Sequence, residues 1–410
     1  MTIYFTPLIL NCIFQVIKKR TKINEISIFG KKINYDKLYL IIFFTILFFI
    51  SAFRPYTVGT DTSHYVGFYN SYLDVGNSYL VDLDIEIGYK ILIFLSSFFS
   101  NPRFLLILTS LIICVGYYLF INKNSNDVYF SSFLFVTLYF FCLSLNIQRQ
   151  SLSMLFIAES IIRLNNNDYK FYSIFVLIAS LFHITSLITL ILLPIHILLK
   201  CKKINSNLDS ILIAIFSFSM FFIDLLMQLI ITIFPKYSYY LNHSFYSEKM
   251  ITNEFIYYIL LFLLLILSLT KILINLNNKF KISKKIVNLL DISIIIILFS
   301  CLIFCISNNR IIGLLCFIVI ILHNYLSNNK NLIYYSTVLS LFVVFMQAKM
   351  AIFDRFIWFF FIMLIIEIPN LCKKSKKIKA LFYLASLLYF LRLLLINSCE
   401  VVPYFINIIF

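Results

Sequence analysis

The stretch LYLIIFFTILFFISAF at residues 38–53 contains no charged side chain and is followed directly by Arg54. A helix of this length rises by roughly 24 Å, close to the ~30 Å hydrocarbon core of a bilayer. Backbone polar groups in lipid are satisfied only in helices or closed barrels, and barrel strands alternate polar and apolar residues. Because this run is continuously apolar, it predicts a membrane-spanning helix. Similar runs recur at Ile211–Phe234, Phe255–Leu276, Ile286–Ile306 and Ala380–Ile396.

The composition of the whole chain points the same way. Of the 410 residues, 61% are hydrophobic and 13% are charged, and the mean hydropathy is +0.95. A soluble domain carries about a quarter charged residues. We therefore predict an all-α integral membrane protein, with residues 1–410 forming a single polytopic helix bundle of about 11–14 spans. Met1–Ile17 lacks the features of a cleaved signal peptide and is expected to be the first span.

The net charge of +16 comes from short basic clusters between the apolar runs. These clusters lie at Lys18–Lys37, Lys200–Lys203, Lys271–Lys285 and Lys373–Lys379. They follow the positive-inside rule, and no soluble stretch is long enough to form a basic surface for nucleic acid, so no nucleic-acid partner is expected. With the clusters in the cytoplasm, residues 54–89 form a first extracytoplasmic loop and residues 235–254 a second. Arg310, Arg355 and the C-terminal Ser398–Phe410 also face outward.

The region 90–199 allows two topologies. If every apolar run crosses the membrane, Asn146–Gln150 lies on the cytoplasmic side. If Lys90–Phe99, which is short for a span, is interfacial or re-entrant, Asn146–Gln150 lies on the outer side instead. The positive-inside rule favours the second topology, because Lys123, Arg163 and Lys170 then face inward and only Arg103 and Arg149 face outward. In that topology Phe171–Leu199 forms a tight hairpin with His183 near its outer turn.

Metal and disulfide chemistry are not expected. The nine cysteines are scattered, and the pair Cys301 and Cys305 lies one helical turn apart in an apolar run, which fits neither a disulfide framework nor a zinc site. The acidic residues are too far apart in sequence to indicate a cation site. No metal and no cofactor are therefore predicted.

The first extracytoplasmic loop is the segment richest in functional side chains. It contains Arg54, Asp61 and Tyr65, and it ends on Glu86 just before the next apolar run. Arginine can hold a phosphate through two parallel hydrogen bonds, tyrosine packs against sugar rings, and carboxylates accept hydrogen bonds from hydroxyls. Taken singly, the same residues would be headgroup anchors, an interfacial aromatic belt and solvated acids.

Two further segments place polar side chains between apolar runs. In the first, Asn146, Gln148 and Gln150 surround Arg149, either as a simple turn or as amides that orient a guanidinium at an anion site. In the second, His183 lies inside an apolar stretch, where it could be a helix–helix hydrogen bonder, a proton acceptor or a phosphate contact.

Arginines gather on the side predicted to face outward. Arg54, Arg149, Arg310 and Arg355 all fall there, against the usual statistics, so a bound anion such as a lipid pyrophosphate would explain them. Arg103 is expected to be an interfacial anchor only.

Four motifs in this order resemble the EpsG-like branch of the Wzy-type polysaccharide polymerases. They are Phe53-Arg-Pro-Tyr-Thr-Val-Gly-Thr-Asp-Thr-Ser-His-Tyr65, Glu86-Ile-Gly-Tyr89, Asn146-Ile-Gln-Arg-Gln150 and Leu181-Phe-His-Ile-Thr-Ser186. The resemblance covers about Leu40–Leu193, and beyond it only Asn309-Arg310 and the outward C-terminus are similar.

The resemblance implies transfer of a growing chain from undecaprenyl pyrophosphate to a hydroxyl of the next lipid-linked repeat, outside a bacterial inner membrane. It also implies a relation to GT-C glycosyltransferases and a product that is O antigen (in lipopolysaccharide), capsule or exopolysaccharide. The partners would be the lipid-linked oligosaccharide as donor and acceptor, membrane lipid and, as a candidate, a chain-length regulator. On this hypothesis Arg54, Arg149 and Arg310 bind the pyrophosphate, and Asp61, Glu86 or His183 accepts the hydroxyl proton.

Other functions remain open from sequence. A flippase for the same lipid would show repeated halves and charges at the membrane midplane, and neither pattern is present. A membrane O-acetyltransferase would place its active His and Arg toward the cytoplasm. A passive scaffold would leave the outward arginines without a role.

Overall fold

The computed structural model describes two compact units. The described residues are 2–404 apart from 23, 29–30, 202–206, 224, 226–227, 230–231, 233–253, 277–283, 305–309, 327–329, 350–352 and 374. The first unit combines Met1–Thr189 with Ile362–Phe410, and the second is Leu190–Phe361. Both are helical, and the sheet found in the described residues is one antiparallel hairpin of two strands.

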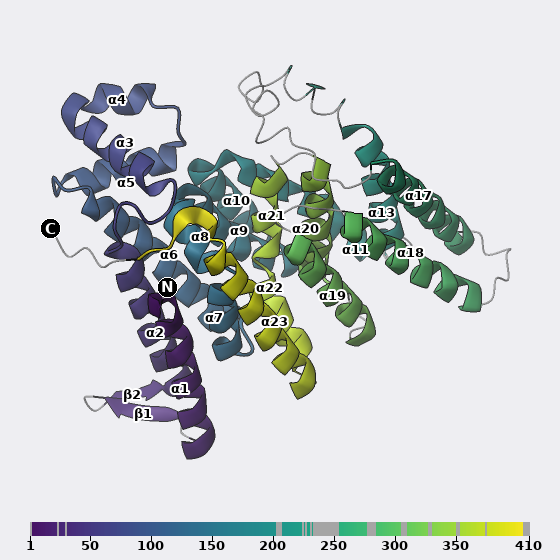
Figure 1. The fold of residues 1–410 in the computed structure, drawn as a ribbon, viewed down its shortest axis with the longest axis horizontal. Coiled ribbons are helices and arrows are strands. Elements are labelled where there is room, and N and C mark those ends of the chain that lie inside the picture. The colour runs from purple at the N-terminus through teal and green to yellow at the C-terminus, as the bar shows by residue number, and fades with distance from the viewer. Residues whose placement is uncertain are drawn as a thin grey trace. The chain divides into compact units, whose positions relative to one another are not determined.

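The first unit contains helices of very different lengths. Its elements are η1 (Thr2–Phe5), α1 (Thr6–Thr21), β1 (Glu25–Ile28), β2 (Lys31–Asn34), α2 (Tyr35–Ala52), α3 (Thr62–Val75), α4 (Asn77–Asp82), α5 (Ile87–Ser97), α6 (Arg103–Asn124), α7 (Val128–Thr137), α8 (Phe140–Asn146), α9 (Gln148–Asn165), α10 (Tyr169–Phe182), α22 (Leu364–Cys372), α23 (Lys376–Leu395) and η5 (Ser398–Glu400). Within this unit α2 packs along α6, and α9 along α10 (Figure 1).

One end of the first unit, here called the basic end, is defined by two ion pairs. Lys18 pairs with Asp36, and Lys379 pairs with Asp127, each at 2.5 Å. Polar N-caps begin helices at this end, because a side-chain oxygen satisfies backbone N–H groups that lack helical partners. Asn34, directly before α2, accepts a hydrogen bond from the N–H of Asp36 (2.8 Å). Asp127, directly before α7, accepts one from the N–H of Phe130 (3.1 Å).

The opposite end, here called the Arg54 end, brings together Tyr4, Val401 and the loop after α2. The Tyr4 hydroxyl donates to the carbonyl of Val401 (2.8 Å), and the Arg103 guanidinium donates to the carbonyl of Arg54. The C-terminal strap, residues 397–404, lies across the same loop, where the N–H of Gly59 donates to the carbonyl of Glu400 (3.1 Å).

Helix directions follow from these contacts and bear on the ambiguous region. Helix α6 runs from Arg103 at the Arg54 end to Lys123, which pairs with Glu159 of α9 at 2.9 Å near the basic end. Helix α9 therefore starts at the Arg54 end with Arg149 and finishes near the basic end with Arg163. This agrees with the topology that the positive-inside rule favoured. Which end faces the cytoplasm stays a prediction.

Two irregular helices shape the Arg54 end. Helix α5 has 11 residues and rises by roughly 16 Å, about half of a bilayer core. It does not cross the unit, since both Glu86 before it and Arg103 after it lie at the Arg54 end. Helices α7 and α8 are bent by 48° relative to each other. At the bend, Tyr139 has a φ of 75° and its hydroxyl donates to the carbonyl of Ser398 (2.6 Å).

The second unit is a set of packed helices with their own core. It contains α11 (Leu192–Lys200), α13 (Leu208–Phe221), α17 (Glu254–Leu276), α18 (Lys284–Phe304), α19 (Arg310–Leu326), α20 (Leu332–Lys349) and α21 (Asp354–Phe361). Helix α17 packs against α13 and α18, while α20 packs against α19 and α21.

The predicted all-α polytopic class is confirmed. In the described residues five helices are long and apolar enough to cross a membrane, or up to seven if two bent pairs each form one span, and shorter apolar helices add to them. The count of 11–14 spans, the single membrane domain and the extracytoplasmic position of residues 54–89 stay predictions. Of the second predicted loop, residues 235–253 lie outside the described residues.

Candidate functional site

Glu86 joins three segments at the Arg54 end. One carboxylate oxygen, Oε2, accepts a hydrogen bond from the Arg149 guanidinium at 2.6 Å. The other, Oε1, lies 3.2 Å from Nδ1 of His183 and accepts the backbone N–H of Ile184 at 3.2 Å. Three residues that the sequence suggested separately are therefore in direct contact.

The local fold explains how these side chains meet. Glu86 is the residue before α5, Arg149 lies in the first turn of α9, and His183 directly follows α10. Close packing of α5 on α10 needs Gly88, because a Cβ there would lie 2.6 Å from the carbonyl oxygen of Leu181. Helices α9 and α10 are tied by Ser153, whose hydroxyl donates to the carbonyl of Ala179 (2.8 Å).

The charges around Glu86 keep it ionised. Burial raises the pKa of Glu86, but the contact with His183 and the positive charge of Arg149 outweigh burial and lower the pKa to about 2. A carboxylate with so low a pKa is a weak proton acceptor at neutral pH. Its geometry suits a different task, which is to orient the Arg149 guanidinium and the His183 ring.

Asn146 fixes the first loop rather than the Arg149 guanidinium. Its Oδ1 accepts hydrogen bonds from the Thr60 hydroxyl (2.8 Å) and from the N–H of Asp61 (2.7 Å). The loop comes this close because Gly59 has a φ of +89°, and a Cβ there would lie 2.6 Å from the carbonyl oxygen of Leu145. Asp61 is thereby held, half-buried, just before α3.

Two buried tyrosines lie beside Arg149. The rings of Tyr65 and Tyr89 are 5.0 Å apart, and the Tyr89 hydroxyl donates to Oε1 of Gln148 at 2.9 Å. Burial raises the pKa of Tyr65 to about 12, although the charge of Arg149 acts against it. Nε of Arg149 and Nε2 of Gln148 are buried donors with no hydrogen-bond acceptor among the described residues.

Arg54 and Arg103 form a second cluster of positive charge. Arg54 is fully buried, and its Nε and Nη2 have no acceptor in the part of the chain that the structure describes. Burial, together with the charge of Arg103, lowers the pKa of Arg54 to about 10, although nearby tyrosines oppose the shift. The expectation that Arg103 is an interfacial anchor is wrong. It is 2% exposed, donates to the Arg54 carbonyl, and lies over the Tyr56 ring at 4.4 Å.

The remaining predicted site residues are distributed over both units. Gln150 is buried in the first unit, one residue beyond Arg149. Arg310 and Arg355 belong to the second unit and are half-buried, with Arg310 as the first residue of α19 and Arg355 as the second residue of α21. Among the described residues no three His, Cys, Asp or Glu side chains lie together in a way that could hold a metal ion.

Sequence reasoning did not select several residues of the site. Tyr89 stood inside a motif, but a tyrosine near a helix end carries no distinctive signal, and nothing in the sequence indicated that Gln148 accepts a hydrogen bond from the Tyr89 hydroxyl. Arg103 was misread because an arginine at the start of an apolar run is usually an anchor. The C-terminal strap, which contacts Gly59 and Thr60 through Glu400 and Cys399, had no sequence signal for this contact.

Comparison with known proteins gives a family and no individual relative. None of the curated proteins and none of the solved structures matches the chain. A model of the EpsG family matches residues 37–312, about two thirds of the chain. That range includes Arg54, Glu86, Arg149 and His183. The resemblance seen in the sequence motifs is confirmed, and the chain belongs to the EpsG family.

Proposed function

We propose that the protein polymerises undecaprenyl-pyrophosphate-linked oligosaccharide repeats at the outer face of a bacterial inner membrane. Besides the family membership, one observation carries the proposal: Glu86 holds a guanidinium and an imidazole side by side at the Arg54 end. A transferase with a pyrophosphate leaving group needs these two chemistries, a donor for the anion and an acceptor for a proton.

The reaction assigns each group a role. A hydroxyl of the acceptor repeat attacks the anomeric carbon of the donor chain, a new C–O bond forms, and the bond to the lipid pyrophosphate breaks. The hydroxyl proton passes to His183, and the pyrophosphate leaves with its negative charge. Glu86 contacts Nδ1 of His183, so Nε2 is the nitrogen that takes up the proton.

His183 is the preferred base because Glu86 is poorly suited. The low pKa of Glu86, about 2, reflects its contacts with His183 and Arg149. Protonating Glu86 would weaken both contacts, whereas protonating His183 strengthens its attraction to Glu86. Asp61 stays the alternative base, since its backbone N–H is held by Oδ1 of Asn146 in the loop before α3.

The arginines supply the anion site of the proposal. Arg149 is oriented by Glu86 and is only partly exposed, so a phosphate oxygen that reaches its second nitrogen would do so in a poorly hydrated place. Arg54 and Arg103 add buried donors that make no ion pair with a described carboxylate. An unpaired buried charge costs several kcal/mol, and a bound pyrophosphate would offset that cost. That Arg310 and Arg355 bind substrate stays a prediction from the sequence.

The rival functions fit the first unit less well. A transporter holds its charged residues near the midplane, whereas Arg54, Arg103, Glu86 and Arg149 gather at one end. A cytoplasmic acyl donor would need its site near the basic end. Neither arrangement matches the position of the Glu86 contacts.

Deleting the gene tests the proposed function in cells. A polymerase mutant should carry single repeats on its surface lipid and no long polymer, as judged by gel ladders, and the wild-type gene should restore the ladder. If surface repeats vanish altogether and lipid-linked repeats accumulate on the cytoplasmic leaflet, the protein is a flippase instead.

A further inference from the structure

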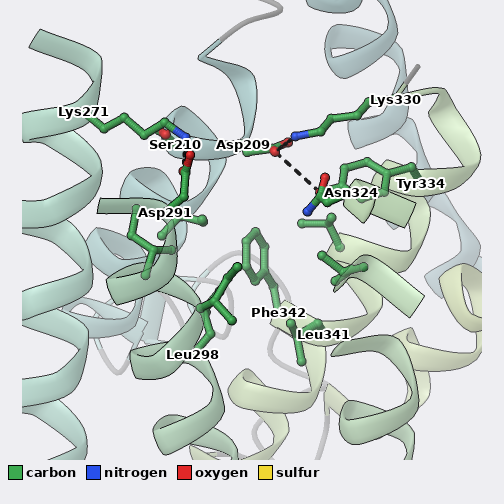
Figure 2. A pocket seen from close by; sticks show the side chains of 15 residues that line it. Asp209, Ser210, Lys271, Asp291, Leu298, Asn324, Lys330, Tyr334, Leu341 and Phe342 are labelled. Atoms are coloured by element: carbon green, nitrogen blue, oxygen red, sulfur yellow. Dashed lines mark hydrogen bonds and ion pairs between the residues drawn. The ribbon is translucent and has the colours of Figure 1, made fainter. Parts of the chain in front are cut away.

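The second unit encloses a cavity that the proposed reaction does not use. It has a volume of about 380 Å³ and lies among α13, α17, α18, α19 and α20 (Figure 2). Small-molecule pockets have volumes of roughly 300–1,000 Å³, so this cavity is large enough for a ligand. All its lining residues fall within Leu190–Phe361.

Two ion pairs border the cavity on opposite sides, as Figure 2 shows. Lys271 of α17 pairs with Asp291 of α18. Lys330, just before α20, pairs with Asp209 in the first turn of α13. The four charges sum to zero. A ligand with a net charge would leave one charge uncompensated in a partly buried place, whereas a zwitterion would preserve neutrality.

Asp209 has an unfilled hydrogen-bonding position. Its Oδ1 is buried and has no hydrogen-bond partner among the described residues, while Oδ2 already accepts a hydrogen bond from the Lys330 ammonium. The Tyr334 hydroxyl reaches Oδ2 only at 3.5 Å, a long contact. Oδ1 is too enclosed for a ligand in the cavity to reach, but an ammonium group, with three donors, can share Oδ2 of Asp209 with Lys330. On the other side, Lys271 presents an ammonium that can contact a phosphate.

The charged end of the cavity also includes Ser210, Asn324 and Tyr334, and the wall away from this end is apolar. Leu298, Leu341 and Phe342 lie below the ion pairs in Figure 2. A ligand that fills the cavity therefore carries both a charged head and a hydrocarbon part. Lys271 is the first residue of the basic cluster Lys271–Lys285, which the sequence assigns to the cytoplasmic side.

We propose that this cavity binds a zwitterionic phospholipid of the phosphoethanolamine type from the cytoplasmic leaflet. The ammonium of the headgroup contacts Asp209, the phosphate contacts Lys271, and the first part of an acyl chain lies against Phe342. The site is separate from the Glu86 contacts and does not depend on the polymerase assignment.

Lipid titration of the purified full-length protein tests this site. Native mass spectrometry should show phosphatidylethanolamine bound at least about tenfold more tightly than phosphatidylglycerol, which lacks the ammonium, or diacylglycerol, which lacks both the ammonium and the phosphate. Free phosphoethanolamine should bind far more weakly than the lipid. Equal binding of all three lipids would overturn the proposal, and so would free phosphoethanolamine that binds as well as the lipid.

A variant assigns the selectivity to the cavity. Asp209→Asn should remove most of the preference for phosphatidylethanolamine while binding of phosphatidylglycerol stays within about twofold. Glu159→Gln, which alters the Lys123 ion pair of the first unit, is the matched control and should keep the full preference. If both variants keep it, the lipid binds elsewhere and the proposal fails. If Asp209→Asn cannot be purified, the lipid selectivity of the wild type is compared with the lipid selectivity of a Lys271→Met variant, and equal selectivity of the two would overturn the proposal.

Discussion

At the scale of single residues, the Arg149 guanidinium is the group whose geometry is most constrained. One nitrogen donates to Glu86 at 2.6 Å, and its Nε is buried beside Tyr65. A guanidinium can keep the Glu86 contact and still offer a second donor to a phosphate. A lysine ammonium is a point charge without this fork, so it cannot replace both contacts at once.

The Arg149→Lys variant should therefore lose polymerisation while reaching the membrane in normal amounts. Loss of a contact made mainly in the transition state costs about 3 kcal/mol, or around a hundredfold in rate. The polymer ladder on a gel should then collapse toward a single repeat.

Arg163→Lys is the matched control for this variant. Arg163 lies in the same helix, α9, and is also ion-paired, with Glu159 at 3.0 Å, but it is near the basic end. It should give a normal ladder. Equal ladders from the two variants at equal abundance would show that Arg149 does not bind the donor.

Glu86 predicts a pH dependence of stability. Its folded-state pKa of about 2 is below its ordinary value of 4.5, so the group stabilises the fold fully above about pH 4.5 and progressively less as pH falls toward 2. The contribution at neutral pH is about 3 kcal/mol. Glu86→Gln should melt below the wild type at pH 7, and the difference in Tm should narrow as the pH approaches 3. A Tm difference that stays constant with pH would mean that the carboxylate charge contributes nothing.

The contacts among these residues could not be predicted, although the residues themselves could. Glu86, Arg149 and His183 each attracted attention as polar groups beside apolar runs. Their mutual distances depend on how α5 packs against α9 and α10, and no local pattern encodes that. For the same reason the sequence left open whether Asn146 belongs to a simple turn or orients Arg149, whereas it accepts hydrogen bonds from Thr60 and Asp61.

At the scale of elements, the loop between α2 and α3 depends on one glycine. Gly59 has a φ of +89°, and a Cβ added to it would lie 2.6 Å from the Leu145 carbonyl oxygen. An alanine would meet both obstacles, and the backbone of α8, to which the Leu145 carbonyl belongs, cannot move away easily. The loop would then lose its hydrogen bonds to Asn146.

We expect Gly59→Ala to lower the free energy of unfolding by at least about 1 kcal/mol and to reduce polymer length. Gly67→Ala is its control, since Gly67 is exposed in α3 with no atom within 4 Å of the added Cβ. Alanine is a better helix former, so that variant should be as stable as the wild type or slightly more so. Thermal melting in detergent checks both, and equal Tm values for the two variants would contradict this account of the loop.

Element lengths were partly predictable. The run at Lys90–Phe99 is visibly short in the sequence, and the structure has a short helix there, α5; that it does not cross the membrane stays a prediction. The bend between α7 and α8 was not predictable, since residues 138–141 (LYFF) contain no glycine or proline and the positive φ falls on Tyr139. There the tertiary contact of Tyr139 with Ser398 outweighs local preference.

At the scale of the whole molecule, the fold class and the difference between the two ends of the first unit were predicted mainly from composition and from the basic clusters. The hydropathy predicted a membrane protein, and the positions of the basic clusters distinguish the two ends of the first unit. The lysines near Asp36 and Asp127 lie at one end, and Arg54 and Arg149 at the other. The role of the C-terminal strap emerged only from the structure, because hydrogen bonds between residues that are far apart in the sequence leave no local pattern.

We propose that this chain alone joins lipid-linked repeats through the Glu86, Arg149 and His183 contacts. Purified protein in proteoliposomes, supplied only with undecaprenyl-pyrophosphate-linked repeat and no sugar nucleotide, tests it most directly. We predict a polymer ladder with one undecaprenyl pyrophosphate released for each linkage formed, and a loss of both products in His183→Asn at equal protein abundance. A wild-type protein that moves the lipid-linked repeat across the bilayer but forms no linkage, or a His183→Asn variant that is as active as the wild type, would contradict the account.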